Sequence, residues 1–171
     1  MTAIRNLSSE VIDNATCDST VLSALAGVSV KADRVIARHA NAASELLKQL
    51  SNSLDKQTRR NVVLNPQTPT AILLQLAPTF PGEFFLNPVF DLLLMENPNL
   101  LFELPVGVLK NILKRPDCPD SFLHWAARYG DKSHQLALVS RSDLSRELLE
   151  YVATGPHVKP AETAAGRLMT W

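Results

Sequence analysis

The sequence predicts an all-α fold, a repeat solenoid of short helices, and three observations predict it. The stretch 65–77 has the pattern of a turn followed by a short helix with one apolar face. The pattern recurs, because matched leucines are separated by 25, 26, 50 and 26 residues, at Leu22, Leu47, Leu73, Leu123 and Leu149. A second short apolar segment precedes several of the turns. A period of about 25 residues is typical of stacked helical units that bury their apolar faces against their neighbours.

The helix predicted within 65–77 follows the turn Asn65-Pro66. Thr68 suits the N-cap position, where its hydroxyl would accept a hydrogen bond from a free backbone N–H. Pro69 suits the first helical position, which needs no N–H. The apolar residues that follow recur at helical spacing and form one stripe, made of Ile72, Leu73, Leu76 and Ala77. A helix this short needs neighbours to bury that stripe.

Matched positions define the rest of the period. Pro69 is matched by Asp18, Ala43, Pro119 and Ser145. The second segments end in apolar residues that lie three positions before a turn residue: Ile36 before His39, Val62 before Asn65, and Leu138 before Arg141. Each period is therefore predicted to contain a helix, a polar connection, a second short helical segment and a turn.

We expect one solenoid domain over residues 1–153, with a lead-in at 1–13 and a C-terminal tail at 154–171. The stretch 78–113 departs from the period, because prolines, which bar long helices, alternate there with phenylalanines. We predict short proline-bounded helices in this stretch, packed as the centre of the core. The tail is expected either to be disordered or to bring Trp171 back over the open end of the solenoid.

The composition is sufficient for one domain or one continuous solenoid, since 46% of the 171 residues are hydrophobic. A formal net charge of zero gives no general attraction to nucleic acid or anionic lipid. No apolar run reaches the length of a membrane span, and the N-terminus lacks the apolar region of a secretory signal. We therefore expect a cytoplasmic protein that does not enter a membrane.

The two cysteines, Cys17 and Cys118, occupy the position that Thr68 holds in its own unit. In a solenoid they would lie too far apart for a disulfide, whose Cα atoms are within about 7 Å of each other. A thiol at the start of a helix can have a lowered pKa. The alternative is that a small residue is simply tolerated at this position.

The pattern Asn-Pro-x-Thr-Pro-x-x-Ile-Leu-x-x-Leu-Ala at 65–77 resembles the repeats of the leucine-rich repeat variant family. The resemblance covers about residues 14–153. It implies a right-handed superhelix in which α-helices alternate with short or 3₁₀ helices, without strands. The founding member of that family holds an iron–sulfur cluster in a separate cysteine-rich segment. Two isolated cysteines cannot supply the four ligands of such a cluster, so the resemblance implies the fold and no cofactor.

No pattern in the sequence predicts catalysis or a metal site. There is no Gly-x-Ser-x-Gly elbow and no glycine-rich phosphate loop. Asp117 and Asp120 flank a predicted helix start, where negative charge is favourable, so we do not infer a pair of catalytic acids. The histidines form no His-x-x-x-His pair and the cysteines no Cys-x-x-Cys pair; the histidines are His39, His124, His134 and His157.

One position of the repeat points away from the predicted stripe, and it carries Ala24, Gln49, Gln75, Trp125 and Tyr151. Equivalent positions of a solenoid line up along one face. Trp and Tyr are typical anchors of protein contacts. The leading hypothesis is a non-catalytic protein-interaction module, with an unidentified partner protein bound by Gln49, Gln75, His124, Trp125 and Tyr151. The alternative is that Trp125 and Tyr151 pack against the tail or a neighbouring helix.

Basic residues are frequent in the second segments and turns, at Arg34, Arg38, Arg59, Arg60, Arg115 and Arg141. A face of this kind could bind nucleic acid, which is the alternative function, or could be an ordinary solvated face with internal ion pairs. An enzyme of the helical-repeat type is less favoured, because it needs a cleft with convergent acids that the sequence does not locate. Open ends would also allow self-association.

Overall fold

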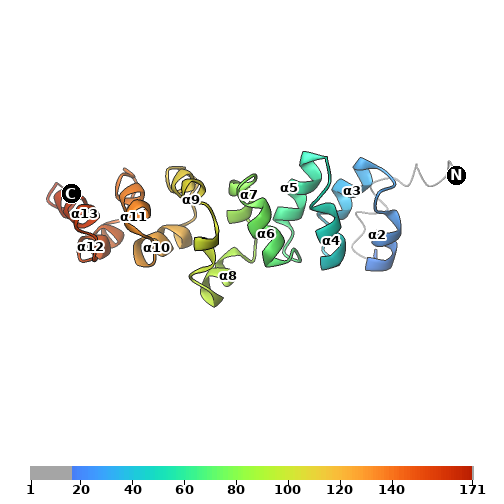
Figure 1. Ribbon diagram of the computed structural model, residues 1–171, viewed down its shortest axis with the longest axis horizontal. Coiled ribbons are helices and arrows are strands. Elements are labelled where there is room, and N and C mark those ends of the chain that lie inside the picture. Colours follow the sequence, from blue (N-terminus) through green and yellow to red (C-terminus); the bar gives the residue numbers. More distant parts are fainter. Residues whose placement is uncertain (1–16, 171) are drawn as a thin grey trace. The chain divides into compact units, whose positions relative to one another are not determined.

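The computed structural model describes residues 17–170, and all regular structure in this range is helical (Figure 1). The prediction of an all-α fold is confirmed. The predicted lead-in at 1–13 and the predicted role of Trp171 lie outside the described residues.

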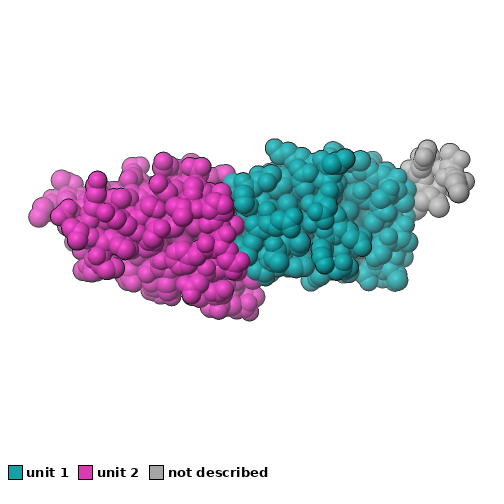
Figure 2. Space-filling model, viewed as in Figure 1, with its two compact units in different colours: residues 1–90 teal, residues 91–171 magenta. Residues whose placement is uncertain are grey.

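The chain divides into two compact units, residues 1–90 and residues 91–171 (Figure 2). The helices of the first unit are α2 (Ser19–Leu25), α3 (Val30–Ile36), α4 (Ser44–Leu50), α5 (Lys56–Leu64), α6 (Thr70–Leu76) and α7 (Pro81–Phe85). Helix α8 (Phe90–Glu96) begins at the last residue of that unit. The second unit continues with the 3₁₀ helix η2 (Leu100–Glu103), α9 (Val106–Leu113), α10 (Asp120–Arg128), α11 (Lys132–Val139), α12 (Arg146–Ala153) and α13 (Val158–Leu168).

The positions matched to Pro69 have the same role in every case, because each is the N-cap of its helix: Asp18, Ala43, Pro69, Pro119 and Ser145. Thr68 is therefore not the N-cap, and the helix begins one residue later than expected, at Thr70. Thr68 is buried and its hydroxyl donates to the carbonyl oxygen of Val62 at 2.6 Å. It joins its own turn to the preceding helix instead of capping the following one.

The predicted stripe forms the core. All five matched leucines are buried. The second helices of consecutive helix pairs are in contact with one another. In the first unit α3 contacts α5 and α5 contacts α7, and in the second unit α9 contacts α11 and α11 contacts α13 (Figure 1). Burial of one face of each short helix against its sequence neighbours supplies the packing that such helices lack alone.

In the first unit, asparagines at the turns join consecutive helix pairs. The buried side chain of Asn65 donates from Nδ2 to the carbonyl oxygens of Ala37 at 2.9 Å and His39 at 3.0 Å. Asn87 donates in the same way to Val63 at 2.6 Å and to Asn65 at 3.1 Å. Each asparagine thus satisfies two main-chain oxygens of the turn before it.

In the second unit, arginines make the equivalent bonds. Nη1 of Arg141 donates to the carbonyl oxygens of Leu113 and Arg115. Nη1 of Arg167 donates to those of Val139 and Arg141. The donors in both units lie 22 to 28 residues after their acceptors, which is about one period. The same main-chain requirement is therefore met by two different side chains.

The segment predicted as a C-terminal tail contains α13, which contacts both α11 and α12. This correction has a simple cause. The buried face of α13 consists of Pro160 and Ala164, and alanine gives no recognisable apolar stripe in a sequence. Arg167 holds the end of this helix through the two main-chain bonds described above.

The irregular stretch 78–113 does consist of short helices next to prolines, as predicted: α7 begins at Pro81, and Pro105 is the N-cap of α9. Phe84, Phe85 and Phe90 are buried with ring centroids 4.7 to 5.5 Å apart. Phe102 departs from the expected core position, because it is 47% exposed.

Candidate functional site

The five residues predicted to bind a partner differ in their exposure to solvent. Gln49, Gln75, His124 and Tyr151 are exposed, but Trp125 is only 3% exposed. The prediction that Trp125 points outward is therefore wrong.

Trp125 is a core residue of the second unit. Its Nε1 donates to the carbonyl oxygen of Pro98, and its ring centroid lies 5.2 Å from that of Phe102 and 5.4 Å from that of Phe122. The ring of His134 lies 5.7 Å away on another side. The irregular segment before α9 covers this side of α10, which is why the outward position of the repeat is buried here.

Tyr151 lines a cavity of about 430 Å³, which we call the Tyr151 cavity. It lies where the connection from α10 to α11 faces the connection from α12 to α13. Its walls include two half-exposed tyrosines, Tyr129 at 43% and Tyr151 at 44%. The complete lining is Ala127, Arg128, Tyr129, Gly130, Gln135, Tyr151, Thr154, Gly155, Pro156 and His157.

The local fold fixes these walls. Tyr129 is the C-cap of α10, and its N–H donates to the carbonyl oxygen of Trp125 at 2.8 Å. Asp131 begins α11 with a capping box, in which its side chain accepts from the N–H of His134 and His134 accepts from the N–H of Asp131. On the other side, the N–H of Gly155 donates to Val152 at 3.0 Å and closes the end of α12.

Gln135 lines the cavity from the first turns of α11 and is 3% exposed. Its Nε2 donates to the carbonyl oxygen of Ala127 at 2.7 Å. That oxygen can only accept, so the amide orientation is determined and Oε1 faces the other way. Oε1 is buried and has no hydrogen-bond donor among the described residues. Such an oxygen costs about 1–3 kcal/mol when it stays unpaired.

Arg128 is exposed and lies over Tyr151, with its guanidinium carbon 5.9 Å from the ring centroid. Within the described part of the second unit it has neither a carboxylate nor a carbonyl partner. Three other arginines of the second unit are paired with carboxylates: Arg115 with Asp117, Arg141 with Asp143, and Arg146 with Glu150.

An equivalent cavity occurs in the first unit, where Gln49 has the position of Tyr151. This cavity is about 300 Å³ and is lined by Ala26, Gly27, Asp33, Leu46, Gln49, Leu50, Asn52 and Ser53. Asp33 has the position of Gln135, three residues before the matched Ile36 and Leu138, and accepts from the N–H of Gly27 at 2.8 Å. Gln49 and Tyr151, which share one position of the predicted repeat, thus each line a cavity between consecutive helix pairs.

The next pair of the first unit differs, because Arg59 has the position of Asp33 and Gln135. Its Nη1 donates to the carbonyl oxygen of Ser53 at 2.6 Å, and its guanidinium carbon lies 5.9 Å from the ring centroid of Phe80. Gln75, at the outward position of this pair, is exposed but does not line any of the cavities described for these residues.

The predicted basic face is largely engaged within the protein. Arg34 pairs with Asp55 at 2.6 Å, and Arg60 pairs with Glu83 at 2.6 Å. The hydrogen bond from Arg34 holds the pKa of Asp55 well below its usual range. Both pairs line one cavity of about 500 Å³, so acidic and basic groups alternate around it. Arg38 is exposed and lies two residues after the end of α3.

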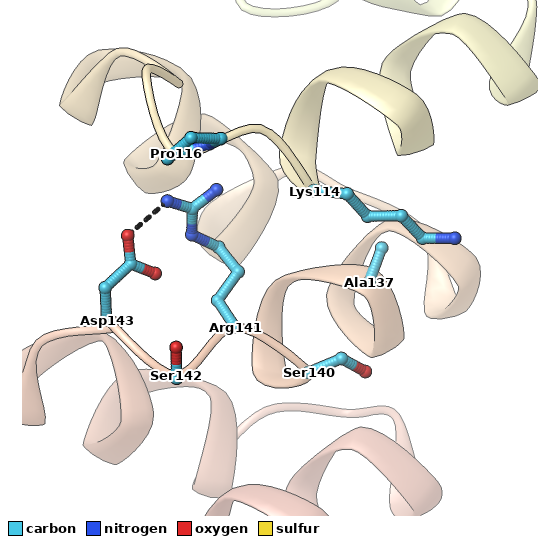
Figure 3. Close-up of a pocket in the computed structure, with 7 residues that line it drawn as sticks. All are labelled: Lys114, Pro116, Ala137, Ser140, Arg141, Ser142 and Asp143. Atoms are coloured by element: carbon cyan, nitrogen blue, oxygen red, sulfur yellow. Dashed lines mark hydrogen bonds and ion pairs between the residues drawn. The ribbon is translucent and has the colours of Figure 1, made fainter.

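Arg141 lines a fourth cavity, of about 460 Å³, with Lys114, Pro116, Asp143 and three smaller residues (Figure 3). Its guanidinium is buried and pairs with Asp143 at 2.6 Å, in addition to its two main-chain bonds. The bond from Arg141 also lowers the pKa of Asp143. The role that these contacts assign to Arg141 is to join two turns. Arg115, which pairs with Asp117, occupies the preceding turn.

The cysteines within residues 17–170 are both free. Burial raises the pKa of Cys118 to about 11, which agrees with the alternative that a small residue is simply tolerated at this position. The reason is that the loss of solvation disfavours the thiolate.

The described residues contain no group of three or more His, Cys, Asp and Glu side chains that could hold a metal ion. In the same part of the chain, every helix is too short or too polar to cross a membrane.

Comparison of the chain with known proteins gave no matching protein family, no matching curated protein and no matching solved structure.

Proposed function

We propose that this chain is a repeat α-solenoid that acts as a non-catalytic protein-interaction module and binds a partner polypeptide at the Tyr151 cavity. The observation that carries the proposal is the cavity itself. A position singled out by the repeat, Tyr151, forms its wall together with Tyr129 and with the buried side chain of Gln135.

Support for the solenoid comes from features that recur inside each unit. The helices alternate in the same order, matched residues are N-caps, and turn side chains bond to the turn one period earlier. These features agree with the resemblance of 65–77 to leucine-rich repeat variant units. We accordingly propose that the helix pairs are repeats of this type.

The lining chemistry suits a polypeptide. Two tyrosine rings supply rigid contact area at a small cost in conformational entropy, and their hydroxyls can bond to a partner. A partner polypeptide could therefore contact both rings and bond to their hydroxyls.

Binding fits this lining better than catalysis. The hydroxyl of Thr154 donates to the carbonyl oxygen of Tyr151 at 3.0 Å. No lining residue makes, within the described chain, the nucleophile–base hydrogen bond that covalent catalysis uses. Nucleic-acid binding by the basic face gains no support either, because Arg34, Arg60 and Arg141 are already paired with carboxylates.

The experiment is a selection of phage-displayed random heptapeptides on the immobilised full chain. Selected peptides are then synthesised and titrated against wild type, Tyr151→Ala and Leu92→Ala. Leu92 is an exposed apolar residue of α8 outside the cavity, so its variant controls for nonspecific adhesion. We expect Tyr151→Ala to weaken binding at least tenfold, as for an aromatic anchor, and Leu92→Ala to leave it unchanged. Equal binding to all three proteins would refute the proposed site.

A further inference from the structure

We infer that the Tyr151 cavity selects acidic segments, with an Asp or Glu side chain of the partner polypeptide paired to Arg128. This inference rests on the proposed function and adds the chemistry of the partner. It is carried by the charge distribution of the second unit and by the geometry of Arg128 over Tyr151.

Arg128 differs from the other described arginines of its unit. Arg115, Arg141 and Arg146 each lie within 2.8 Å of a carboxylate oxygen, and Arg167 donates to two main-chain oxygens. Arg128 makes no hydrogen bond or ion pair to any residue between 17 and 170, and its one described contact is the ring of Tyr151. It is a fixed positive charge whose partner is not in this part of the chain.

The lining leaves that charge uncompensated. Its ten residues include no Asp or Glu. The residues with side-chain N–H groups in the lining are Arg128, Gln135 and His157, and the Gln135 N–H is used by Ala127. A ligand carboxylate would meet donors here and no repelling carboxylate. A ligand ammonium or guanidinium would meet Arg128 as a like charge.

The position of Arg128 suits a carboxylate. Its guanidinium carbon lies 5.9 Å from the ring centroid of Tyr151, within the range of a cation–π contact, and the N–H groups at its edge are bonded to no described residue. Those edge groups match the two oxygens of a carboxylate in a bidentate pair. The cation–π contact also holds the long side chain in place, so less conformational entropy is lost when a ligand binds.

The polypeptide source is favoured over a nucleic acid, which is also an anion. Nucleic-acid binding commonly uses several phosphate contacts, and its affinity grows with their number. The cavity is lined by one arginine and no lysine, so it offers one such contact, which suits a single carboxylate of a polypeptide.

The test uses the heptapeptides selected on the full chain. Among those whose binding is weakened by Tyr151→Ala, we expect Asp and Glu to be enriched over the unselected library and Lys and Arg to be depleted. A synthetic peptide from this set should bind Arg128→Gln at least about tenfold more weakly than wild type, because the bidentate, charge-assisted pair is lost. Replacing its acidic residue by the amide should cause a similar loss on wild type, and little further loss on Arg128→Gln.

Arg146→Gln is the matched control, because Arg146 is also an exposed helix arginine but is paired with Glu150 and does not line the cavity. It should bind as wild type does. Far-UV circular dichroism of each variant checks that the helices are retained. A short oligothymidylate is titrated in parallel against wild type and Arg128→Gln.

The outcomes separate the two proposals. If peptides sensitive to Tyr151→Ala carry no acidic preference, or bind Arg128→Gln as well as wild type, the inference about charge is wrong and the proposed function stands. If no selected peptide is sensitive to Tyr151→Ala, both are wrong. If the oligothymidylate binds through Arg128 and the peptides do not, the partner is nucleic acid and the inference is overturned.

Discussion

Removing the side chain of Asn65 should destabilise the fold, because it deletes the hydrogen bonds that join two helix pairs of the first unit. Asn65 is 2% exposed, and its Nδ2 bonds to the carbonyl oxygens of Ala37 and His39, while Oδ1 accepts from the N–H of Gln67 at 2.9 Å. Asn65→Ala deletes all three bonds. Asn65→Asp keeps the shape and the acceptor for Gln67, but turns a negative oxygen toward two carbonyl oxygens.

The expected loss follows from which atoms are left unpaired. The oxygen of Ala37 has no other donor among the described residues, so it carries the full penalty of a buried unpaired acceptor, about 1–3 kcal/mol. The oxygen of His39 also accepts from the N–H of Ala42, so only a net bond of about 1 kcal/mol is lost there. With the bond to Gln67, Asn65→Ala should lower the free energy of unfolding by about 3 kcal/mol. Asn65→Asp should cost at least as much.

Urea unfolding followed by far-UV circular dichroism measures this loss, and Asn97→Ala is the matched control. Asn97 stands in another Asn-Pro turn, and its Oδ1 accepts from the N–H of Asn99 at 3.0 Å. Unlike Asn65, it is exposed and its amide donates to no described residue. Its replacement should cost less than about 1 kcal/mol. If Asn65→Ala costs no more than Asn97→Ala, the bonds between turns do not stabilise the fold and the reasoning is wrong.

Three further predictions concern a glycine, a histidine and a thiol of the second unit. Gly130→Ala should destabilise the protein by about 2 kcal/mol in the same urea assay, because the added Cβ would overlap a backbone carbonyl oxygen of α10. Gly107→Ala, whose Cβ meets open space within α9, should be neutral or stabilising by about 0.5–1 kcal/mol, and equal effects would contradict the steric argument. Burial lowers the pKa of His134, so the unfolded chain binds a proton more readily than the folded one. Stability should be full above the ordinary value of about 6.5 and should fall as the pH drops through it toward the folded pKa. His134→Gln should flatten this part of the pH profile of urea midpoints, and an unchanged profile would assign the effect elsewhere. Cys118, with a pKa near 11, should react with a disulfide reagent about 100-fold more slowly than a free thiol in a Cys17→Ser background, and at the free rate in urea. Rapid reaction in the folded state would show that the thiol is not buried as described.

The sequence predicted the helices best where the leucine stripe is regular. Leu47, Leu73 and Leu149 were placed in the core from spacing alone, and they are fully buried. The leucine stripe did not predict α13, because the buried face of that helix is made of Ala164 and Pro160. Another signal was present in the turns. Arg115, Arg141 and Arg167 are spaced by 26 residues, so the spacing of the arginines continues into α13, where the stripe fades.

The candidate site was only half predictable for a related reason. Tyr151 was singled out from its outward position, and it is exposed and lines a cavity. Trp125 has the same position but is buried, because Pro98 and Phe102 come from an irregular segment that no regular repeat places there. A rule about equivalent positions holds only while the neighbours are equivalent. Gln135 gave no signal at all, since its unpaired oxygen is a property of the folded geometry.

The turn chemistry explains why arginines are abundant without forming a binding face. An asparagine reaches two carbonyl oxygens with a neutral amide, as at Asn65. An arginine at the same kind of turn brings a charge into a nearly buried position, which is costly unless an acid is near. Arg141 pairs with Asp143 two residues later, and Arg115 pairs likewise with Asp117. The positive charges of Arg115 and Arg141 are therefore each neutralised by a carboxylate two residues later. Arg128 lies at the end of α10 and has no such acid among the described residues, which is why we propose that a ligand neutralises its charge.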